Sequence, residues 1–126
     1  MIGAFYDVYN AMGYGFLEGT YLNALEAELT ARGHEVAREV AVVIRYKGKP
    51  VGLQRIDMIV DGGVVVEVKS TERLAQSGHR QLLSYLAASD LEVGLLLHFG
   101  PEAKFYRHVS SNDRREPRSD EGTPRW

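Results

Sequence analysis

Residues 55–70, RIDMIVDGGVVVEVKS, hold two apolar segments separated by Asp61-Gly62-Gly63. Turn residues between two runs rich in β-branched residues are typical of a β-hairpin. Glu67 and Lys69 are two residues apart, so on a strand both side chains leave the same face. The strand is predicted to be largely buried, because its other residues are Val64, Val65, Val66 and Val68. A carboxylate and an ammonium are costly in such a place unless their charge is used.

The length of the loop decides which residues meet across this hairpin. With a three-residue loop, Val60 pairs with Val64, and Asp57 lies opposite Glu67. Directly paired residues share a face of a sheet, so Asp57 would then converge with Glu67 and Lys69. Three-residue loops that contain a left-handed glycine are common. A two-residue loop would instead place Asp57 opposite Val68, on the wrong face.

The three residues suggest a specific chemistry. Two carboxylates on neighbouring strands can share one Mg²⁺ or Mn²⁺, with water and phosphate oxygens as the remaining ligands. Such an ion polarises a phosphoryl group and lowers the pKa of a bound water. A lysine beside it can orient the attacking water or stabilise developing negative charge. The alternative is that Glu67 and Lys69 form an ordinary pair on a solvated strand face, because Glu-x-Lys is a common pattern.

Composition limits the kinds of site that this chain can build. The 126 residues are enough for one domain with a core of its own. The absence of cysteine excludes disulfides and thiolate metal sites, so a metal would need oxygen or histidine ligands. The net charge of −2 argues against a strong nonspecific binder of polyanions. The histidines show no metal-ligand spacing (His34, His79, His98 and His108).

Two further observations concern where the protein acts. No apolar run approaches the roughly 18 residues that a membrane span needs. The N-terminal sequence MIGAFYDVYN lacks the basic and apolar regions of a signal peptide. A cytoplasmic protein without membrane association is therefore predicted.

Periodicity along the chain predicts a mixed fold. Helical spacing of apolar residues predicts helices at about 5–12, 17–32 and 74–88, with Gly33 as a cap and with Leu82, Leu83 and Leu86 facing inward. Alternating or continuous apolar runs predict strands at 36–46, 51–60, 64–69, 93–99 and 103–109, with a turn at 47–50. This order predicts an α/β (α+β) fold around one mixed sheet. Residues 1–109 are predicted to form the domain, and residues 110–126 a polar, disordered tail.

Several motifs in order give the chain a family resemblance. GFLEGTY, residues 15–21, matches the motif of the GxxExxY proteins, with Gly15, Glu18 and Tyr21 in place. The chain therefore resembles this group within the PD-(D/E)XK nuclease-like superfamily, over about residues 3–108. One departure is Ile56, which replaces the usual proline before the aspartate. The other matching segments are YKG (46–48), RIDMIV (55–60), VVVEVKS (64–70), QLLSYL (81–86) and VGLLLHFG (93–100).

The resemblance implies a restriction-endonuclease-like core of α-β-β-β-α-β topology, with helices flanking a central mixed sheet. It implies that Asp57 and Glu67 are metal carboxylates and that Lys69 is the catalytic lysine. Glu18 resembles the acidic residue that many members add to the metal shell, directly or through water. Gln81 and Tyr85 resemble the Q-x-x-x-Y element of RecB-like nucleases, which supports the active site or the scissile strand. Their spacing of four places them on one helix face.

Some residues keep two interpretations at this stage. Tyr21 is either a core aromatic or a substrate-positioning residue. Arg55 lies two residues before Asp57 and is expected on the same face, where it would contact phosphate or pair with a carboxylate. Lys47 and Lys49 form a basic turn that is either a solvated loop or a contact for a nucleic-acid backbone.

The sequence favours a Mg²⁺- or Mn²⁺-dependent nuclease that hydrolyses phosphodiester bonds, with DNA favoured over RNA. One alternative is a catalytically silent module that binds nucleic acid or a protein partner. Another is a small-molecule or structural role in which the polar cluster is a buried network. A homodimer or a larger partner is also predicted, because the domain is compact for holding a duplex alone.

Overall fold

The computed structural model describes residues 1–110, so the prediction for the tail concerns residues that lie almost wholly outside the described part. The described elements agree with the predicted order, although β2 begins at Lys49 rather than at 51 and α3 begins at Gln76 rather than at 74. No helix within residues 1–110 has the length and apolar character needed to cross a membrane. In chain order the elements are α1 (Ile2–Met12), α2 (Glu18–Ala31), β1 (Val36–Tyr46), β2 (Lys49–Val60), β3 (Val64–Lys69), α3 (Gln76–Ala88), β4 (Val93–Phe99) and β5 (Ala103–Val109).

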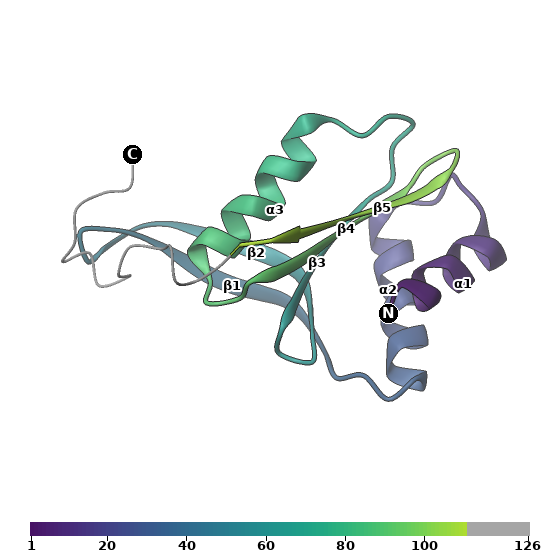
Figure 1. The fold of residues 1–126 in the computed structure, drawn as a ribbon, viewed down its shortest axis with the longest axis horizontal. Helices are drawn as coiled ribbons and strands as arrows, with labels where there is room; N and C mark the ends of the chain where they lie inside the picture. Colours follow the sequence, from purple (N-terminus) through teal and green to yellow (C-terminus); the bar gives the residue numbers. More distant parts are fainter. Residues whose placement is uncertain (111–126) are drawn as a thin grey trace.

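The five strands form one mixed sheet in the order β1-β2-β3-β4-β5. β3 and β4 run parallel and are joined by α3, and the other neighbours are antiparallel. In Figure 1, α1 and α2 lie on one side of the sheet and α3 lies on the other. The predicted fold class is therefore confirmed: a mixed sheet flanked by helices.

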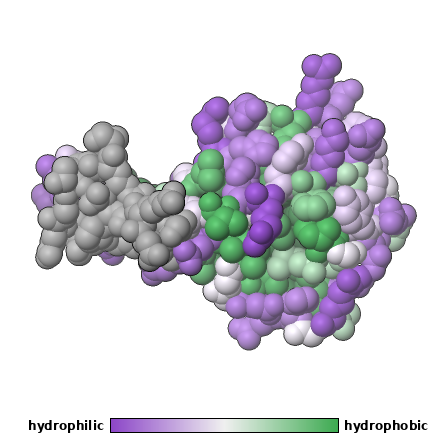
Figure 2. Space-filling model, viewed as in Figure 1, coloured by the Kyte–Doolittle hydropathy of each residue, from purple (hydrophilic) through white to green (hydrophobic). Residues whose placement is uncertain are grey.

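Each face of the sheet packs on its own apolar core. Side chains from α1 and α2 meet one face, and aromatic contacts join Phe5, Tyr21 and Phe99 there. Side chains from α3 meet the other face, where Leu82 and Leu86 are fully buried. Figure 2 shows apolar groups in the middle of the face seen in Figure 1, with polar residues around them. The two central strands β3 and β4 are nearly all apolar, as strands with both faces covered require.

The end of α2 confirms the predicted role of Gly33. The Gly33 N–H donates to the Thr30 carbonyl at 3.0 Å, and the His34 N–H donates to the Leu29 carbonyl at 3.0 Å. These two bonds form a Schellman motif, which needs a left-handed residue after the helix. Gly33 adopts that conformation, with φ of 88°, at no steric cost. The chain then turns directly into β1.

The turn between β2 and β3 has the three-residue loop on which the predicted site depends. Val60 pairs with Val64, so three residues lie between the strands. Asp61 and Gly62 both have positive φ, 53° and 64°. The Asp61 carboxylate accepts a hydrogen bond from the Glu35 N–H at 2.8 Å, which fixes the turn against the start of β1. The register that brings Asp57 toward Glu67 is therefore the one observed.

The predicted inward face of α3 is wrong at one position. Leu83 is 44% exposed, whereas Leu82 and Leu86 are fully buried. The buried residues of α3 are Gly78, Leu82, Tyr85 and Leu86, and at about 100° per residue Leu83 lies outside the arc that they cover. Leu82 packs directly over Gly94 of β4, where an added Cβ would lie 2.7 Å from Leu82 Cδ1.

The difference between these neighbouring leucines predicts a difference in stability. Leu82→Ala should lower the free energy of unfolding by about 2–5 kcal/mol, because it leaves a cavity between α3 and the sheet. Leu83→Ala, the matched control, should change it by only about 0.5 kcal/mol, because the side chain is solvated. Urea unfolding followed by circular dichroism measures both values. Equal losses for the two variants would contradict this placement of α3.

Candidate active site

The candidate site lies in a fork between β2 and β3. These strands pair over three residue pairs only, ending at Met58↔Val66. β3 remains paired with β4 along its length, whereas β2 follows β1 away from the sheet centre, as Figure 1 shows. The first residues beyond the last β2–β3 pair are Asp57 and Glu67. The two carboxylates therefore stand where the strands begin to separate.

The residues of β2 change face beside Asp57. Met58 belongs to the core under α1 and α2, but Ile56, two residues away, belongs to the core under α3. Regular alternation would put Met58 and Ile56 on one face. The break lies opposite Glu39, a residue with φ of 53° whose neighbours on β1 pair with Met58 and Ile56. Asp57 lies two residues from Ile59, which packs on the core under α3, so regular alternation already puts Asp57 on the side of Glu67, and the change of face falls between Asp57 and Ile56.

Glu67 is the most unusual ionisable residue among those described. It is only 2% exposed, and its Oε2 atom is buried without a hydrogen-bond donor. Burial, and then the negative charge and close contact of Asp57, raise the pKa of Glu67 to about 8, against the opposing effect of Lys69. Two carboxylates have no proton to donate to each other when both are ionised. They can therefore lie in contact only by sharing a proton or a cation.

A chain of hydrogen bonds continues from Glu67 onto α3. Lys69 Nζ lies 3.5 Å from Glu67 Oε1 and donates to Gln81 Oε1 at 2.9 Å. Gln81 Nε2 in turn donates to the Tyr85 hydroxyl oxygen at 2.8 Å. Burial and the charges of Glu67 and Asp57 raise the pKa of Tyr85 to about 12, so the phenol stays protonated. The structure thus brings five of the residues singled out in the sequence together: Asp57, Glu67, Lys69, Gln81 and Tyr85.

Two supporting residues were missed in the sequence. Ser84 Oγ donates to the Gln81 carbonyl at 2.8 Å, and Gln54 Nε2 reaches Ser84 Oγ at 3.5 Å. They connect β2 with α3 beside the site. A signal was present, because Ser84 is three residues after Gln81 and Gln54 is three residues before Asp57. Neither spacing is specific enough to predict the contact from sequence.

Glu18 is not in contact with the two carboxylates. It is the first residue of α2 and is half-buried. The loop before it is held near the end of β3, because Ser70 Oγ donates to the Phe16 carbonyl at 2.5 Å. Yet the charges that act on Glu67 are those of Asp57 and Lys69. Within residues 1–110 no three histidine, aspartate or glutamate side chains are grouped closely enough to hold a metal ion.

Tyr21 is a core aromatic. Its side chain is fully buried, and its ring stacks on Phe99 with centroids 4.1 Å apart. Its hydroxyl donates to the Gly13 carbonyl and accepts from the Phe16 N–H at 3.3 Å. These bonds shape the loop that leads into α2 and leave no free surface for contact with a substrate.

The predicted face of Arg55 is wrong. Arg55 is exposed, and both of its neighbours face α3: Gln54 contacts Ser84, and Ile56 lies in the core under α3. Alternation along the strand therefore points Arg55 away from α3. The prediction failed because the change of face at Asp57 breaks the regular period of two.

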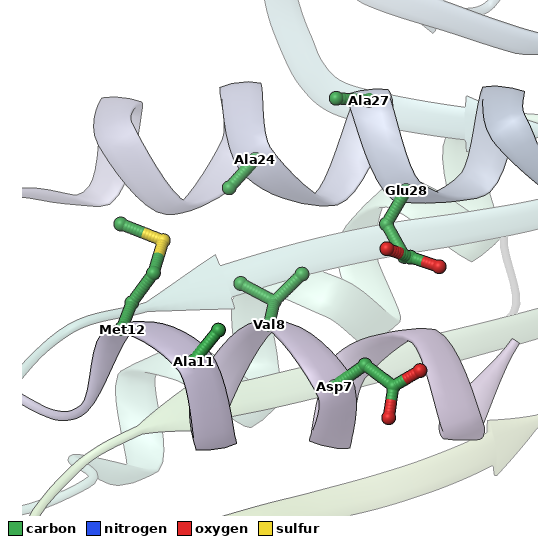
Figure 3. Close-up of a pocket in the computed structure, with 7 residues that line it drawn as sticks. All are labelled: Asp7, Val8, Ala11, Met12, Ala24, Ala27 and Glu28. Carbon is green, nitrogen blue, oxygen red and sulfur yellow. The ribbon is translucent and has the colours of Figure 1, made fainter.

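A groove of about 340 Å³ lies between α1 and α2, on the other side of the sheet from this site. Figure 3 shows Met12 at one end and the carboxylates of Asp7 and Glu28 toward the other. Both carboxylates are paired with Arg32. The rest of the lining consists of Val8, Ala11, Ala24 and Ala27, so the groove offers little chemistry of its own.

The donor set of the fork fits a divalent cation. Asp57 and Glu67 supply carboxylate oxygens, the ligands that Mg²⁺ and Mn²⁺ prefer. Glu67 Oε2, buried and without a donor, is the atom that such an ion would satisfy. The raised pKa of Glu67 agrees with this, because burial first and the Asp57 carboxylate second disfavour its charge, and a bound cation would offset both.

The pKa of Glu67 predicts how the stability of the metal-free protein depends on pH. The folded-state pKa of about 8 exceeds the ordinary value of 4.5, so folding favours the protonated carboxyl. The stabilisation from this group is complete below pH 4.5 and is lost as pH rises through about 8. Thermal unfolding in the presence of a chelator should therefore show a melting temperature that falls over this interval.

The variant Glu67→Gln tests whether Glu67 causes this pH dependence of the melting temperature. Glu67→Gln should flatten the pH dependence and melt higher than the wild type above pH 8, because the amide carries no charge. Glu102→Gln, at a carboxylate whose side chain is 79% exposed, should leave the wild-type slope unchanged. An unchanged slope in Glu67→Gln would contradict the assignment.

Comparison with known proteins bears on the same region of the chain. The family model described as the PD-(D/E)XK nuclease superfamily matches residues 1–109. Searches among curated proteins and among solved structures found no match. The matched range includes both carboxylates of the fork, Lys69, and the helix that carries Gln81 and Tyr85. The chain belongs to the PD-(D/E)XK nuclease superfamily.

Proposed function

We propose that this protein is a divalent-metal-dependent nuclease that hydrolyses phosphodiester bonds in DNA. The observation that carries the proposal is the buried contact between the carboxyl groups of Asp57 and Glu67, with Glu67 Oε2 left without a donor. Membership of the superfamily indicates a nuclease and hence a nucleic-acid substrate. PD-(D/E)XK nucleases generally use divalent metals. Mg²⁺ or Mn²⁺ is the ion we propose here, and DNA the substrate.

Asp57 and Glu67 are the residues that would hold the ion. When bound, a divalent cation polarises a phosphoryl oxygen and lowers the pKa of a coordinated water. Glu18 is proposed to act on this shell through a water molecule, since it has no direct contact with either carboxylate but begins the helix next to the end of β3.

Lys69 is placed to act on the reacting groups. Its ammonium has three donors, of which one is used by Gln81 and a second faces Glu67 at 3.5 Å. The third can orient the attacking water or stabilise negative charge that develops on the phosphate. In hydrolysis the water oxygen bonds to phosphorus, one P–O ester bond breaks, and the departing sugar oxygen takes up a proton. Gln81 and Tyr85 are positioning residues, because they act through Lys69.

The GFLEGTY motif supports a place within the GxxExxY group. We further propose a cytoplasmic location and action as a homodimer or with a larger partner. A catalytically silent module that binds nucleic acid or a protein is the alternative, and what favours it is that two carboxylates rather than three meet within residues 1–110.

Removal of one carboxylate tests the activity. With Mn²⁺ or Mg²⁺ the wild type should cleave DNA, and Glu67→Gln should slow cleavage about a hundred-fold or more, because metal assistance is worth several kcal/mol. Titration calorimetry with Mn²⁺ should show weaker binding to the same variant. Glu102→Gln is the control and should match the wild type in both assays. A wild type that binds DNA yet cleaves neither DNA nor RNA with either ion would establish the silent module instead.

Substitution of Lys69 should lower the cleavage rate without a comparable loss of metal binding. Lys69→Met should lower the single-turnover cleavage rate about a hundred-fold, because it removes a charge that stabilises the transition state. Its affinity for Mn²⁺ should stay within a few-fold of the wild type, because both carboxylates remain. If Lys69→Met loses Mn²⁺ binding as fully as Glu67→Gln, Lys69 holds the carboxylates in place and has no separate catalytic role.

A further inference from the structure

The β1–β2 hairpin carries an unusual charge distribution. Residues 40–56 contain four cations and no acidic residue, in a chain whose net charge is −2. We call residues 43–55 the basic arm. Its cations are Arg45, Lys47, Lys49 and Arg55.

The cations of the basic arm have no counter-charges within the described chain. Residues 45–53 are all exposed, and Arg55 is exposed as well. Among residues 1–110, none of the four cations forms a salt bridge. Their contacts are weak ones: Arg45 Nη1 reaches the Gly48 carbonyl at 3.4 Å, and Lys47 Nζ lies 5.3 Å from the Tyr46 ring centroid. Positive charge that is unpaired and solvated in this way is free to meet an anion.

The basic arm extends directly from the proposed active site. Arg55 and Asp57 belong to the same strand, β2, which begins at Lys49. Eight residues of strand separate Lys49 from Asp57, about 26 Å at 3.3 Å per residue. Figure 1 shows the β1–β2 hairpin running out past the end of α3. A nucleic-acid strand that lies across the fork therefore has this arm beside it for several nucleotides.

The arm also exposes apolar and aromatic groups. Tyr46 is 47% exposed, and Leu53 is 63% exposed opposite Val43, with which it pairs. The face of the arm turned away from α3 carries the two arginines, Arg45 and Arg55, together with Val43 and Leu53. The two lysines lie at the turn, beyond the residues that contact α3. An exposed tyrosine among cations suits nucleotides, because bases stack on its ring while phosphates meet the charges.

The charge of the basic arm favours a polyanion over a second copy of the chain as its binding partner. A second copy of the chain packed on the same face would bring like charges together, since that face has two arginines and no acidic residue. Contact between like charges costs energy and selects against such a partner. A polyanion gains from the same charges, because each neutralised phosphate releases counterions.

We propose that the basic arm binds the phosphate backbone of the nucleic-acid substrate and holds it beyond the active site. The proposal rests on the proposed function for the identity of the substrate. The lysines at the tip, Lys47 and Lys49, provide sequence-independent contacts, and Tyr46 stacks on an unpaired base.

The test compares two double variants with the same change of charge. Lys47→Gln/Lys49→Gln neutralises the tip of the arm, whereas Lys104→Gln/Arg107→Gln neutralises two exposed cations on β5, at the opposite edge of the sheet. Affinity for a labelled DNA duplex and its single strand is measured against salt in the Glu67→Gln background without metal, so that cleavage plays no part. The arm variant should reduce the slope of log affinity against log salt by about 2, because two phosphate contacts are lost. The β5 variant should keep the parent slope.

The outcomes distinguish a failure of the arm proposal from a failure of the nuclease proposal. Lys47→Arg/Lys49→Arg should restore binding, and circular dichroism should show that all variants are folded. If the arm variant binds with the parent slope, the arm does not hold nucleic acid, whether or not the wild type cleaves. If the arm variant changes the molar mass by light scattering while the slope stays fixed, the arm is a protein interface and the proposal fails. If binding depends on the arm but no wild-type cleavage occurs, the arm proposal stands and the nuclease proposal fails.

Discussion

Two carboxyl groups from neighbouring strands, those of Asp57 and Glu67, lie against each other where only 2% of Glu67 is exposed. Water cannot solvate the charges there, and each charge disfavours the other. The fold must therefore hold this contact by other means. The fixed turn at Asp61 sets the register, and the pairing of β3 with β4 holds Glu67 in place. The cores on both faces of the sheet supply the stability that the contact does not.

The strands β2 and β3 separate beside this contact. A continuous ladder would pair Asp57 with Glu67, but the pairing ends at Met58↔Val66. The cost of the lost pairs is limited because each strand keeps a partner on its other side, β1 for β2 and β4 for β3. The left-handed Glu39 gives β1 and β2 the change of face that the separation needs. Local regularity is thus given up beside the two carboxylates.

Much of this arrangement could be predicted from the sequence, because it depends on local signals. Turn residues and β-branched runs gave the hairpin, the order of elements gave the mixed sheet, and the spacing of Gln81 and Tyr85 gave their shared face. The errors fall where long-range geometry overrides a local period. Arg55 lies on the other face because of the irregularity opposite Glu39, which no nearby glycine or proline announces. Leu83 is exposed because it lies outside the arc of α3 that packs on the sheet, which Leu82, Tyr85 and Leu86 occupy.

The net charge hides a segregation of charges along the chain. The value of −2 averages a hairpin with four cations and no acid against acidic residues elsewhere, such as Asp7 and Glu28, which pair with Arg32 on α2's side of the sheet. The two ends of β2 therefore differ in the sign of the charge that they present to a phosphodiester. At the tip, cations that form no salt bridge within residues 1–110 favour the approach of a phosphodiester, whereas the carboxylates of Asp57 and Glu67 repel it unless a cation lies between them. In the proposed function the arm and the fork are complementary, because the arm would supply affinity for the substrate and the fork would make cleavage conditional on the ion.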